Sequence, residues 1–329
     1  MTLFSRFLTL SGIFALSLHS SVQAAAKVIV DGSSTVFPIS EAVGEEFQKL
    51  NRSTQVAVAA SGTGGGFKKF CKGEVDMTGA SRPIEQTEID ACAESKVEFV
   101  ELPVAYDGIA IVVNPKNTWA KTLTTAELKK IWEPGSKVKT WKDVRADFPD
   151  TKITLFGPGP DSGTFDYFTK VINGKEKASR TDYTSSESDF VIVNGVKGEM
   201  GAIGYFGVAY YESNKSALGL VKVDAGKGAI APTPETIASG TYAPLSRPIF
   251  MYASTKSLAR PEVAAFAEYY VNNAGELSGQ VGYVSLGQAL YAQVLERLRA
   301  KKTGSMFKEH GPNASVSLND LMKPAKSKK

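Results

Sequence analysis

The sequence predicts an α/β fold with mostly parallel strands. Short apolar runs alternate with segments of helical periodicity along the chain. A length of 329 residues suits two domains better than one. With 43% hydrophobic and 22% charged residues, the composition is that of a globular protein and excludes a disordered chain or a coiled coil. The net charge of +4 comes from interspersed signs, so no basic patch indicates nucleic-acid binding.

The first 24 residues have the pattern of a secretory signal peptide. Arg6 precedes an apolar run over 7–18, and Val22-Gln23-Ala24 follows as a small-x-small cleavage pattern. The run is too short to cross a membrane as a helix. We therefore expect residues 1–24 to be removed and Ala25 to begin the mature chain. No cysteine follows the run to carry a lipid, which favours the periplasm as the destination.

Strand and helix signals alternate regularly through the first third of the chain. Apolar runs predict strands over 27–32, 55–60, 74–78 and 97–102, and helical spacing predicts helices over 38–50, 67–72 and 85–94. The helix over 38–50 has proline in its first turn, where proline is tolerated. Its apolar residues fall on one face: Ile39, Val43, Phe47 and Leu50.

The remaining elements follow a long apolar run over 106–114. Helices are expected over 123–132, 164–173, 191–196, 261–273 and 288–301, with strands over 153–156, 202–206 and 247–252. Glu127 lies in the first turn of the helix that Thr124 or Thr125 caps. The apolar runs over 106–114 and 247–253 are interpreted as crossings between two lobes. Lobe 1 would then comprise residues 26–111 and 249–329, and lobe 2 residues 112–248.

Cys71 and Cys92 are the two cysteines of the chain, and both remain after processing. In an exported protein such a pair predicts a disulfide, whose 20-residue loop would stabilise the fold by roughly 3 kcal/mol. A metal site is the alternative, but two thiols without a nearby histidine are a poor ligand set. We expect no metal.

Histidine is scarce enough to argue against catalysis. His19 leaves with the signal peptide, so His310 in a polar C-terminal tail is the one histidine of the mature chain. A Ser-His-Asp triad would need that tail residue to reach a pocket. We therefore predict that the protein is not an enzyme. Neither the P-loop motif of nucleotide-binding proteins nor the glycine-rich dinucleotide motif is complete, so we also predict that it uses no cofactor.

Three segments share one design: a strand, a loop of small hydroxyl-bearing residues, and a helix start. They cover residues 31–38, 61–68 and 159–165. A helix N-terminus presents unpaired N–H groups and a partial positive charge, and glycine allows close approach of the backbone. Each loop alone fits an ordinary helix cap. Three converging loops would instead surround a small oxyanion with neutral donors.

Two arginines are candidates for the cation of such a site. Arg82 lies at a predicted strand end among small residues, where a planar guanidinium could bind an oxyanion bidentately. The alternative is an arginine that pairs with Glu85 or Glu88. Arg180 is a second candidate, with a surface ion pair as the more ordinary interpretation.

These same segments resemble a known family. DGSSTVFPI, SGTGGGFKKF, VDMTGASRPI, YDGIAIVVNP, GPDSGTFDYF and GAIGYFG occur in the order found in the periplasmic phosphate-binding proteins of the Pst type. They look closest to the SphX-like branch, which begins DGSST. The resemblance implies a type II periplasmic-binding-protein fold, with two lobes joined by two crossing strands that close on one inorganic phosphate. It also implies a monomeric receptor that delivers phosphate to the permease subunits of an ABC transporter.

Carried over from the resemblance, the phosphate ligands are Ser34, Thr35, Ser61, Thr63, Ser162, Gly163 and Thr164. The chain departs from the enterobacterial-type receptor at two positions. Arg82 stands where that receptor has the aspartate that accepts the phosphate proton, and Pro158 stands where it has an arginine. We therefore expect Arg82 to be the main ionic ligand.

The proton acceptor is left open by this exchange. Asp161, Asp107 and Asp182 are candidates, with helix capping or turn formation as the alternative role for each. A buried carboxylate that accepts a phosphate proton rejects fully ionised sulfate by like-charge repulsion. Without an assigned acceptor, a receptor for another tetrahedral oxyanion such as sulfate or molybdate stays open. So do an exported phosphatase that uses Ser34 or Ser162, and a binding or adhesion protein without a transporter.

Overall fold

A computed structural model describes residues 26–307 of the chain. The predicted signal peptide, the proposed mature start and His310 therefore lie outside the described residues. Within the described range, no helix is both long and apolar enough to cross a membrane. The strands are β1 (Ala26–Gly32), β2 (Thr54–Val58), β3 (Met77–Ala80), β4 (Phe99–Val113), β5 (Thr122–Thr124), β6 (Thr154–Pro158), β7 (Thr184–Ser186), β8 (Ala202–Gly207), β9 (Gly219–Asp224), β10 (Ala229–Ile230) and β11 (Ser246–Ser254). The helices are α1 (Phe37–Leu50), α2 (Thr63–Phe70), α3 (Gln86–Glu94), α4 (Thr125–Trp132), α5 (Trp141–Val144), α6 (Gly163–Asn173), α7 (Asp189–Gly198), α8 (Val208–Asn214), α9 (Pro234–Ala238), the 3₁₀ helix η1 (Ser257–Ala259), α10 (Pro261–Gln280) and α11 (Gln288–Arg299).

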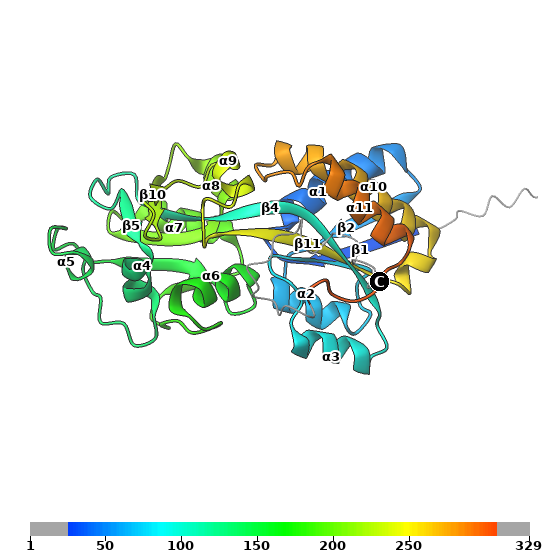
Figure 1. Ribbon diagram of the computed structural model, residues 1–329, viewed down its shortest axis with the longest axis horizontal. Coiled ribbons are helices and arrows are strands. Elements are labelled where there is room, and N and C mark those ends of the chain that lie inside the picture. The colour runs from blue at the N-terminus through cyan, green and yellow to red at the C-terminus, as the bar shows by residue number, and fades with distance from the viewer. Residues whose placement is uncertain (1–25, 308–329) are drawn as a thin grey trace, which may run out of the picture.

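The elements form two halves that β4 and β11 connect (Figure 1). Strand order runs β2-β1-β3-β11-β4-β8-β6-β7, and β9 also pairs with β4. One half, called the β1 half below, contains β1–β3, α1–α3, α10 and α11. The other, called the β6 half, contains β5–β10 and α4–α9. The mixed α/β arrangement confirms the predicted α/β class. The expectation of mostly parallel strands is wrong, because the connecting strands β4 and β11 pair antiparallel with each other and with β8, β9 and β3.

The two connecting strands pair antiparallel along the whole of β11 and the first two thirds of β4. Register runs from Ser246↔Gly108 to Ser254↔Phe99, with an irregularity between Ile249 and Phe250. The strand expected over 97–102 and the run over 106–114 are thus one continuous strand, β4. Most side chains on both faces of β4 and β11 are buried, because other elements of each half cover these two strands.

In the β1 half, parallel pairing of β1 with β2 and β3 places three strand ends and their loops at one edge of the sheet. Helix α1 buries Val43 and Phe47 and packs against α10, whereas Leu50 is 72% exposed. The prediction that Leu50 belongs to the buried face is therefore wrong. Leu50 is the last residue of α1.

The glycine-rich segment is helical rather than a loop. The sequence predicts a helix from residue 67, but α2 begins at Thr63. The reason is packing against β1: a Cβ at Gly66 would lie 2.5 Å from Cα of Gly32. Glycine at this point lets the first turn of α2 approach the strand backbone.

The predicted disulfide is confirmed. Cys71 and Cys92 are bonded, and both are buried. Cys71 directly follows α2 and Cys92 lies in α3, so the bond ties these two helices together. No thiol is therefore left for a metal, since the chain has no other cysteine.

The apolar cores follow the two halves. One cluster gathers buried residues almost entirely from 109–245, around the ring contacts of Trp132 with Phe168 and Tyr205. Two further clusters gather residues from 28–105 and 249–307, apart from Ala209. The exact lobe boundaries stay a prediction.

Candidate binding site

The first and third of the three predicted loops meet between the halves. Oγ1 of Thr35, in the β1–α1 loop, lies 3.0 Å from Oγ1 of Thr164 in the first turn of α6, and both residues are buried. The backbone N–H of Thr35 donates to Ser33 Oγ at 3.1 Å, and the Tyr283 hydroxyl donates to the Thr35 carbonyl. These bonds fix the loop so that the Thr35 hydroxyl faces α6.

The second loop meets the third through the N-termini of α2 and α6. The backbone N–H of Gly64 donates to the Asp161 carbonyl at 3.0 Å. Oγ1 of Thr63 lies 3.3 Å from Oγ of Ser81, at the end of β3. A Cβ at Gly163 would come within 2.5 Å and 2.6 Å of these two hydroxyl oxygens, so glycine is required for the approach. All three predicted loops therefore converge.

The hydroxyls of Ser162 and Ser61 hold their own loops in place. Oγ of Ser162 accepts the N–H of Thr164 at 3.1 Å and caps α6. The hydroxyl and N–H of Ser61 donate to Oδ1 of Asp31 at 2.8 and 3.0 Å. Burial alone would raise the pKa of Asp31, but hydrogen bonds from Lys69 and Ser61 lower it. Ser61 thus anchors the second loop to the end of β1.

Arg247 is the cation that the fold brings to these loops. Its guanidinium donates to the Gly163 carbonyl at 3.0 Å, to Thr164 Oγ1 at 2.8 Å and to Oδ2 of Asp107 at 3.0 Å. The side chains of Arg247 and Asp107 are 1% and 0% exposed. Burial raises the pKa of Asp107, although the guanidinium opposes the change.

A second buried carboxylate lies beside this pair. Asp189 is the first residue of α7, and burial together with the negative charge of Asp107 raises its pKa to about 7. Arg247 and a hydrogen bond with the Ser34 side chain oppose that rise. Among the described residues, Oδ1 of Asp107 and Oδ2 of Asp189 have no hydrogen-bond partner. The site therefore combines one guanidinium, several hydroxyls and two buried acidic groups.

Arg82 has other partners. It is buried, and two of its nitrogens bind the carboxylate of Glu88 at 2.8 and 2.9 Å while Nε binds Asp166 at 2.9 Å. The remaining bond goes to the Pro83 carbonyl, and Glu85 lies 3.4 Å away. These contacts match the second interpretation of Arg82, an arginine paired with glutamates. They give the expected role of Arg82 as main ionic ligand no support.

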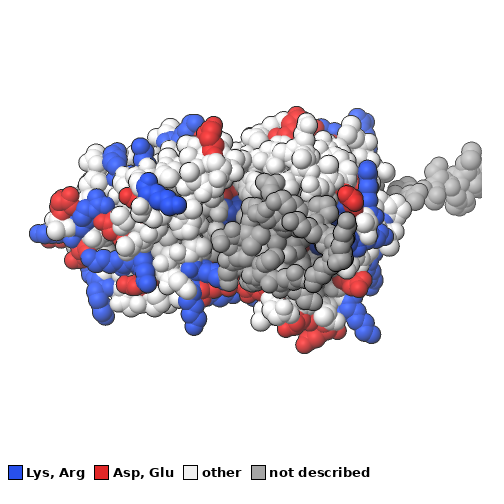
Figure 2. Space-filling view, viewed as in Figure 1, with Lys and Arg blue, Asp and Glu red and all other residues white. Residues whose placement is uncertain are grey.

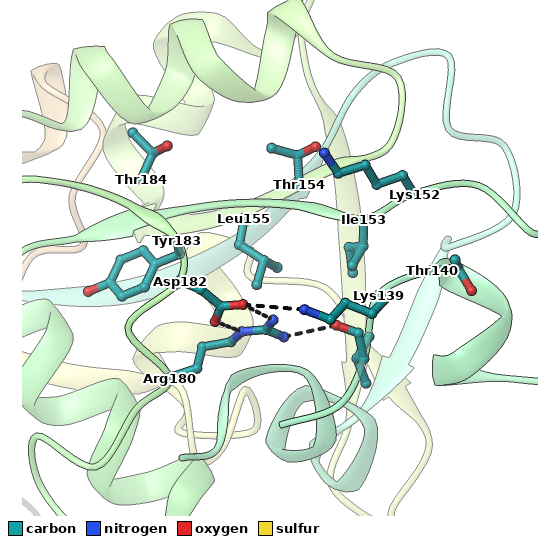
Figure 3. A pocket seen from close by; sticks show the side chains of 11 residues that line it. Lys139, Thr140, Lys152, Ile153, Thr154, Leu155, Arg180, Asp182, Tyr183 and Thr184 are labelled. Carbon is teal, nitrogen blue, oxygen red and sulfur yellow. Dashed lines mark hydrogen bonds and ion pairs between the residues drawn. The ribbon is translucent and has the colours of Figure 1, made fainter. Parts of the chain in front are cut away.

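The side chains of the other candidates do not face the junction of the loops, although the Asp161 backbone is part of the third loop. The Asp161 side chain is 44% exposed and pairs with Lys68 at 2.9 Å. Arg180 and Asp182 bind each other through two bonds of 2.6 and 2.7 Å in a pocket of about 600 Å³ (Figure 3). That pocket includes Thr154 and Thr184, the first residues of β6 and β7, whereas the converging loop follows the opposite end of β6.

Sequence reasoning missed Ser81, Asp189 and Arg247. A signal for Arg247 does exist: one base and one acid interrupt the two apolar crossing runs, and the strands pair Arg247 with Asp107 in register. Opposite charges within strands that are otherwise apolar indicate a buried pair. Ser81 and Asp189 carry no comparable signal, because hydroxyl and acidic residues near helix starts are common caps.

Comparison with known proteins assigns the chain to a family. Residues 19–274 match the PBP superfamily domain, so the chain is a member of that superfamily. Protein SphX of Synechococcus elongatus is 45% identical over 301 residues, which cover 91% of this chain and 88% of SphX. The phosphate-binding protein PstS of Staphylococcus epidermidis is 37% identical over 273 residues, 82% of each chain. The chain therefore belongs to the family of the SphX and PstS proteins.

A solved structure agrees with this assignment. The crystal structure of a possible phosphate binding protein from Planctomyces limnophilus is 48% identical, with a TM-score of 0.64 over 85% of this chain and 100% of that chain. The predicted family and the predicted periplasmic-binding-protein fold are thus confirmed. PstS is named a phosphate-binding protein and the Planctomyces limnophilus protein a possible one, in agreement with the prediction that this chain is not an enzyme.

Proposed function

We propose that this protein binds inorganic phosphate where the N-termini of α2 and α6 meet the β1–α1 loop, and delivers it to an ABC permease. The observation that carries the proposal is the junction of Thr35, Thr164 and Arg247, three buried donors from three separate segments. Relatives named as phosphate-binding proteins support phosphate as the anion.

The donor set suits a tetrahedral oxyanion. The N-termini of α2 and α6 contribute the positive ends of two helix dipoles. The hydroxyls and the glycine backbone proposed as ligands remain those expected from the family: Ser34, Thr35, Ser61, Thr63, Ser162, Gly163 and Thr164. Arg247 replaces Arg82 as the proposed ionic ligand, because its guanidinium donates to Thr164 and Gly163.

The two buried acids favour an anion that carries a proton. Arg247 donates a hydrogen bond to Asp107, and its positive charge acts on Asp189. Each of the two acids has one oxygen without a hydrogen-bond partner among residues 26–307. Hydrogen phosphate can donate its proton to such a carboxylate, whereas sulfate has none to donate and is repelled. These residues replace Asp161 and Asp182 as proposed proton acceptors, since both of the latter are ion-paired and part-exposed.

Closure of two lobes would enclose the anion. The proposed lobes comprise 26–111 with 249–329, and 112–248, and the separate apolar cores support this division. The β1–α1 loop and α2 would then move with lobe 1 and α6 with lobe 2, so that a bound phosphate bridges them.

The proposal includes export to the periplasm and a monomeric receptor. On the face shown in Figure 2, charges of both signs are interspersed rather than gathered in one basic patch.

Isothermal titration of the phosphate-stripped mature chain tests the proposal. We expect tight binding of phosphate that excess sulfate does not abolish. Binding of sulfate with equal affinity would mean a general oxyanion receptor, and binding of neither anion would overturn the proposed function. A null phosphatase assay on the same preparation is expected, because residues 26–307 contain no histidine that could act as a base for either serine.

A further inference from the structure

An ion-pair cluster that is buried at Arg82 and Asp166 and partly buried at its glutamates joins the β1 half and the β6 half, and the proposed phosphate site does not use it. Arg82 and Glu85 come from the segment between β3 and α3, whereas Asp166 lies on α6 and Glu176 follows α6. Nε of Arg82 is 2.9 Å from Oδ2 of Asp166, and these side chains are 4% and 1% exposed. This pair is a desolvated contact between the two halves.

The cluster holds more carboxylates than cations. Its acidic members are Glu85, Glu88, Asp166 and Glu176, and its buried cation is Arg82. Lys177 lies 3.9 Å from Asp166, but its side chain is 54% exposed. The positive charge of Lys170 lowers the pKa of Glu85 without a direct ion pair. Removing this many negative charges from water is unfavourable unless one of them is neutralised.

A divalent cation is the first candidate to neutralise them. Oxygens of Glu85, Asp166 and Glu176 lie within 4.8 Å of one another, a spacing compatible with metal ligation. Nε of Arg82, however, lies 3.4 Å from Glu85 and 3.8 Å from Glu176. The guanidinium therefore already faces these oxygens, and a second cation there would be repelled. A proton is the smaller alternative.

The contact between Glu85 and Glu176 indicates where that proton resides. Oxygens of the two side chains lie within 4.8 Å of each other across the two halves, and both face Nε of Arg82, at 3.4 Å and 3.8 Å. Two carboxylates this close repel each other unless one of them is protonated. Burial, the contact with Glu85 and the negative charges of Glu85 and Asp166 raise the pKa of Glu176 to about 8 against the influence of Arg82. Burial would raise the pKa of Glu85, but Glu176 and Arg82 lower it.

We propose that Glu85 and Glu176 form a proton-sharing latch, so that closure of the two halves on the anion takes up one proton from solvent. The inference rests on the proposed function, because it requires an open form in which the two side chains separate. In that form Glu176 returns to water and to its ordinary pKa of 4.5. Between 4.5 and about 8 the closed form then holds a proton that the open form lacks, so phosphate affinity falls as pH rises through this window.

Proton counting by calorimetry tests the latch. Phosphate is titrated at about pH 6.5 into the mature chain in buffers of different ionisation enthalpy, which gives the protons taken up per phosphate. Wild type is expected to take up close to one proton more than Glu176→Gln, whose amide keeps the contact permanently neutral. The titration of phosphate itself is common to both and cancels. Glu199→Gln, at an exposed position of the same half, is the matched control and should keep the wild-type count.

The outcomes separate the latch from the proposed function. Equal proton counts for wild type and Glu176→Gln overturn the latch while leaving phosphate binding intact. Absence of phosphate binding by wild type at every pH overturns the proposed function instead. If the variant does not fold, carboxyl NMR of wild type decides, because a pKa of Glu176 that is the same with and without phosphate contradicts the latch. Stabilisation by calcium chloride that Glu176→Gln removes would show a metal in the cluster and also overturn it.

Discussion

Neutralising Arg247 in a background that lacks its buried partner is the most direct test of the assigned cation. Arg247 alone cannot be removed cleanly, because Asp107 is 0% exposed and would be left as an unpaired buried charge. Breaking a buried pair in this way costs about 3–5 kcal/mol of folding stability. The informative comparison is therefore Asp107→Asn against the double variant Asp107→Asn/Arg247→Gln.

The expected loss of affinity follows from the bonds that Arg247 makes at the junction. It donates to Thr164 Oγ1 at 2.8 Å and to the Gly163 carbonyl at 3.0 Å, which places its positive charge beside the proposed anion. A hydrogen bond to a charged group contributes about 1.5–3 kcal/mol. We therefore expect the double variant to bind phosphate about 10-fold to 150-fold more weakly than Asp107→Asn.

Calorimetric titration measures both affinities, and urea denaturation confirms that both variants are folded. Two neutral side chains at these positions should restore most of the stability that Arg247→Gln alone loses. Equal phosphate affinities for the two variants would refute the assignment of Arg247. A loss of all binding in Arg82→Gln, with both Arg247 variants unaffected, would return the ionic role to Arg82.

Three further predictions concern the frame around the site. Gly163→Ala should weaken phosphate binding by at least about 10-fold in titration, because its Cβ would lie 2.5 and 2.6 Å from hydroxyl oxygens of the facing segments. Gly279→Ala, which has open space around it, is the control and should leave the affinity unchanged. Equal affinities for the two variants would contradict the close approach at Gly163. Replacing Cys71 and Cys92 by alanine should lower the free energy of unfolding by about 3 kcal/mol in urea, since the reduced chain regains loop entropy; an unchanged midpoint would show that the bond does not act through the unfolded state. Burial raises the pKa of Glu101 in the folded protein, so the folded state loses stability relative to the unfolded chain as pH rises above the ordinary value of 4.5. Denaturation across pH should therefore show Glu101→Gln gaining stability relative to wild type with rising pH, and parallel curves would count against this.

Much of the site could be predicted because its parts are local. Each of the three loops combines a strand end, small hydroxyl residues and a helix start within eight residues, and helix N-termini bind anions wherever they occur. The disulfide was equally accessible, since two cysteines in an exported chain leave one pairing. Even here the limits of local patterns are visible: the glycines at 64–66 suggested a loop, but they are helical because α2 packs against the backbone of β1.

The sequence by itself determined the fold class, the family and the positions of the three loops, because these depend on periodicity and short motifs. Only the tertiary structure decided which arginine contacts the converging loops. Arg82 adjoins a predicted loop yet faces Glu88 and Asp166, whereas Arg247 lies 83 residues from Thr164 and reaches it through the pairing of β11 with β4. The charge balance of a buried site depends on which side chains the packing brings together, and strand register between distant segments fixes that choice.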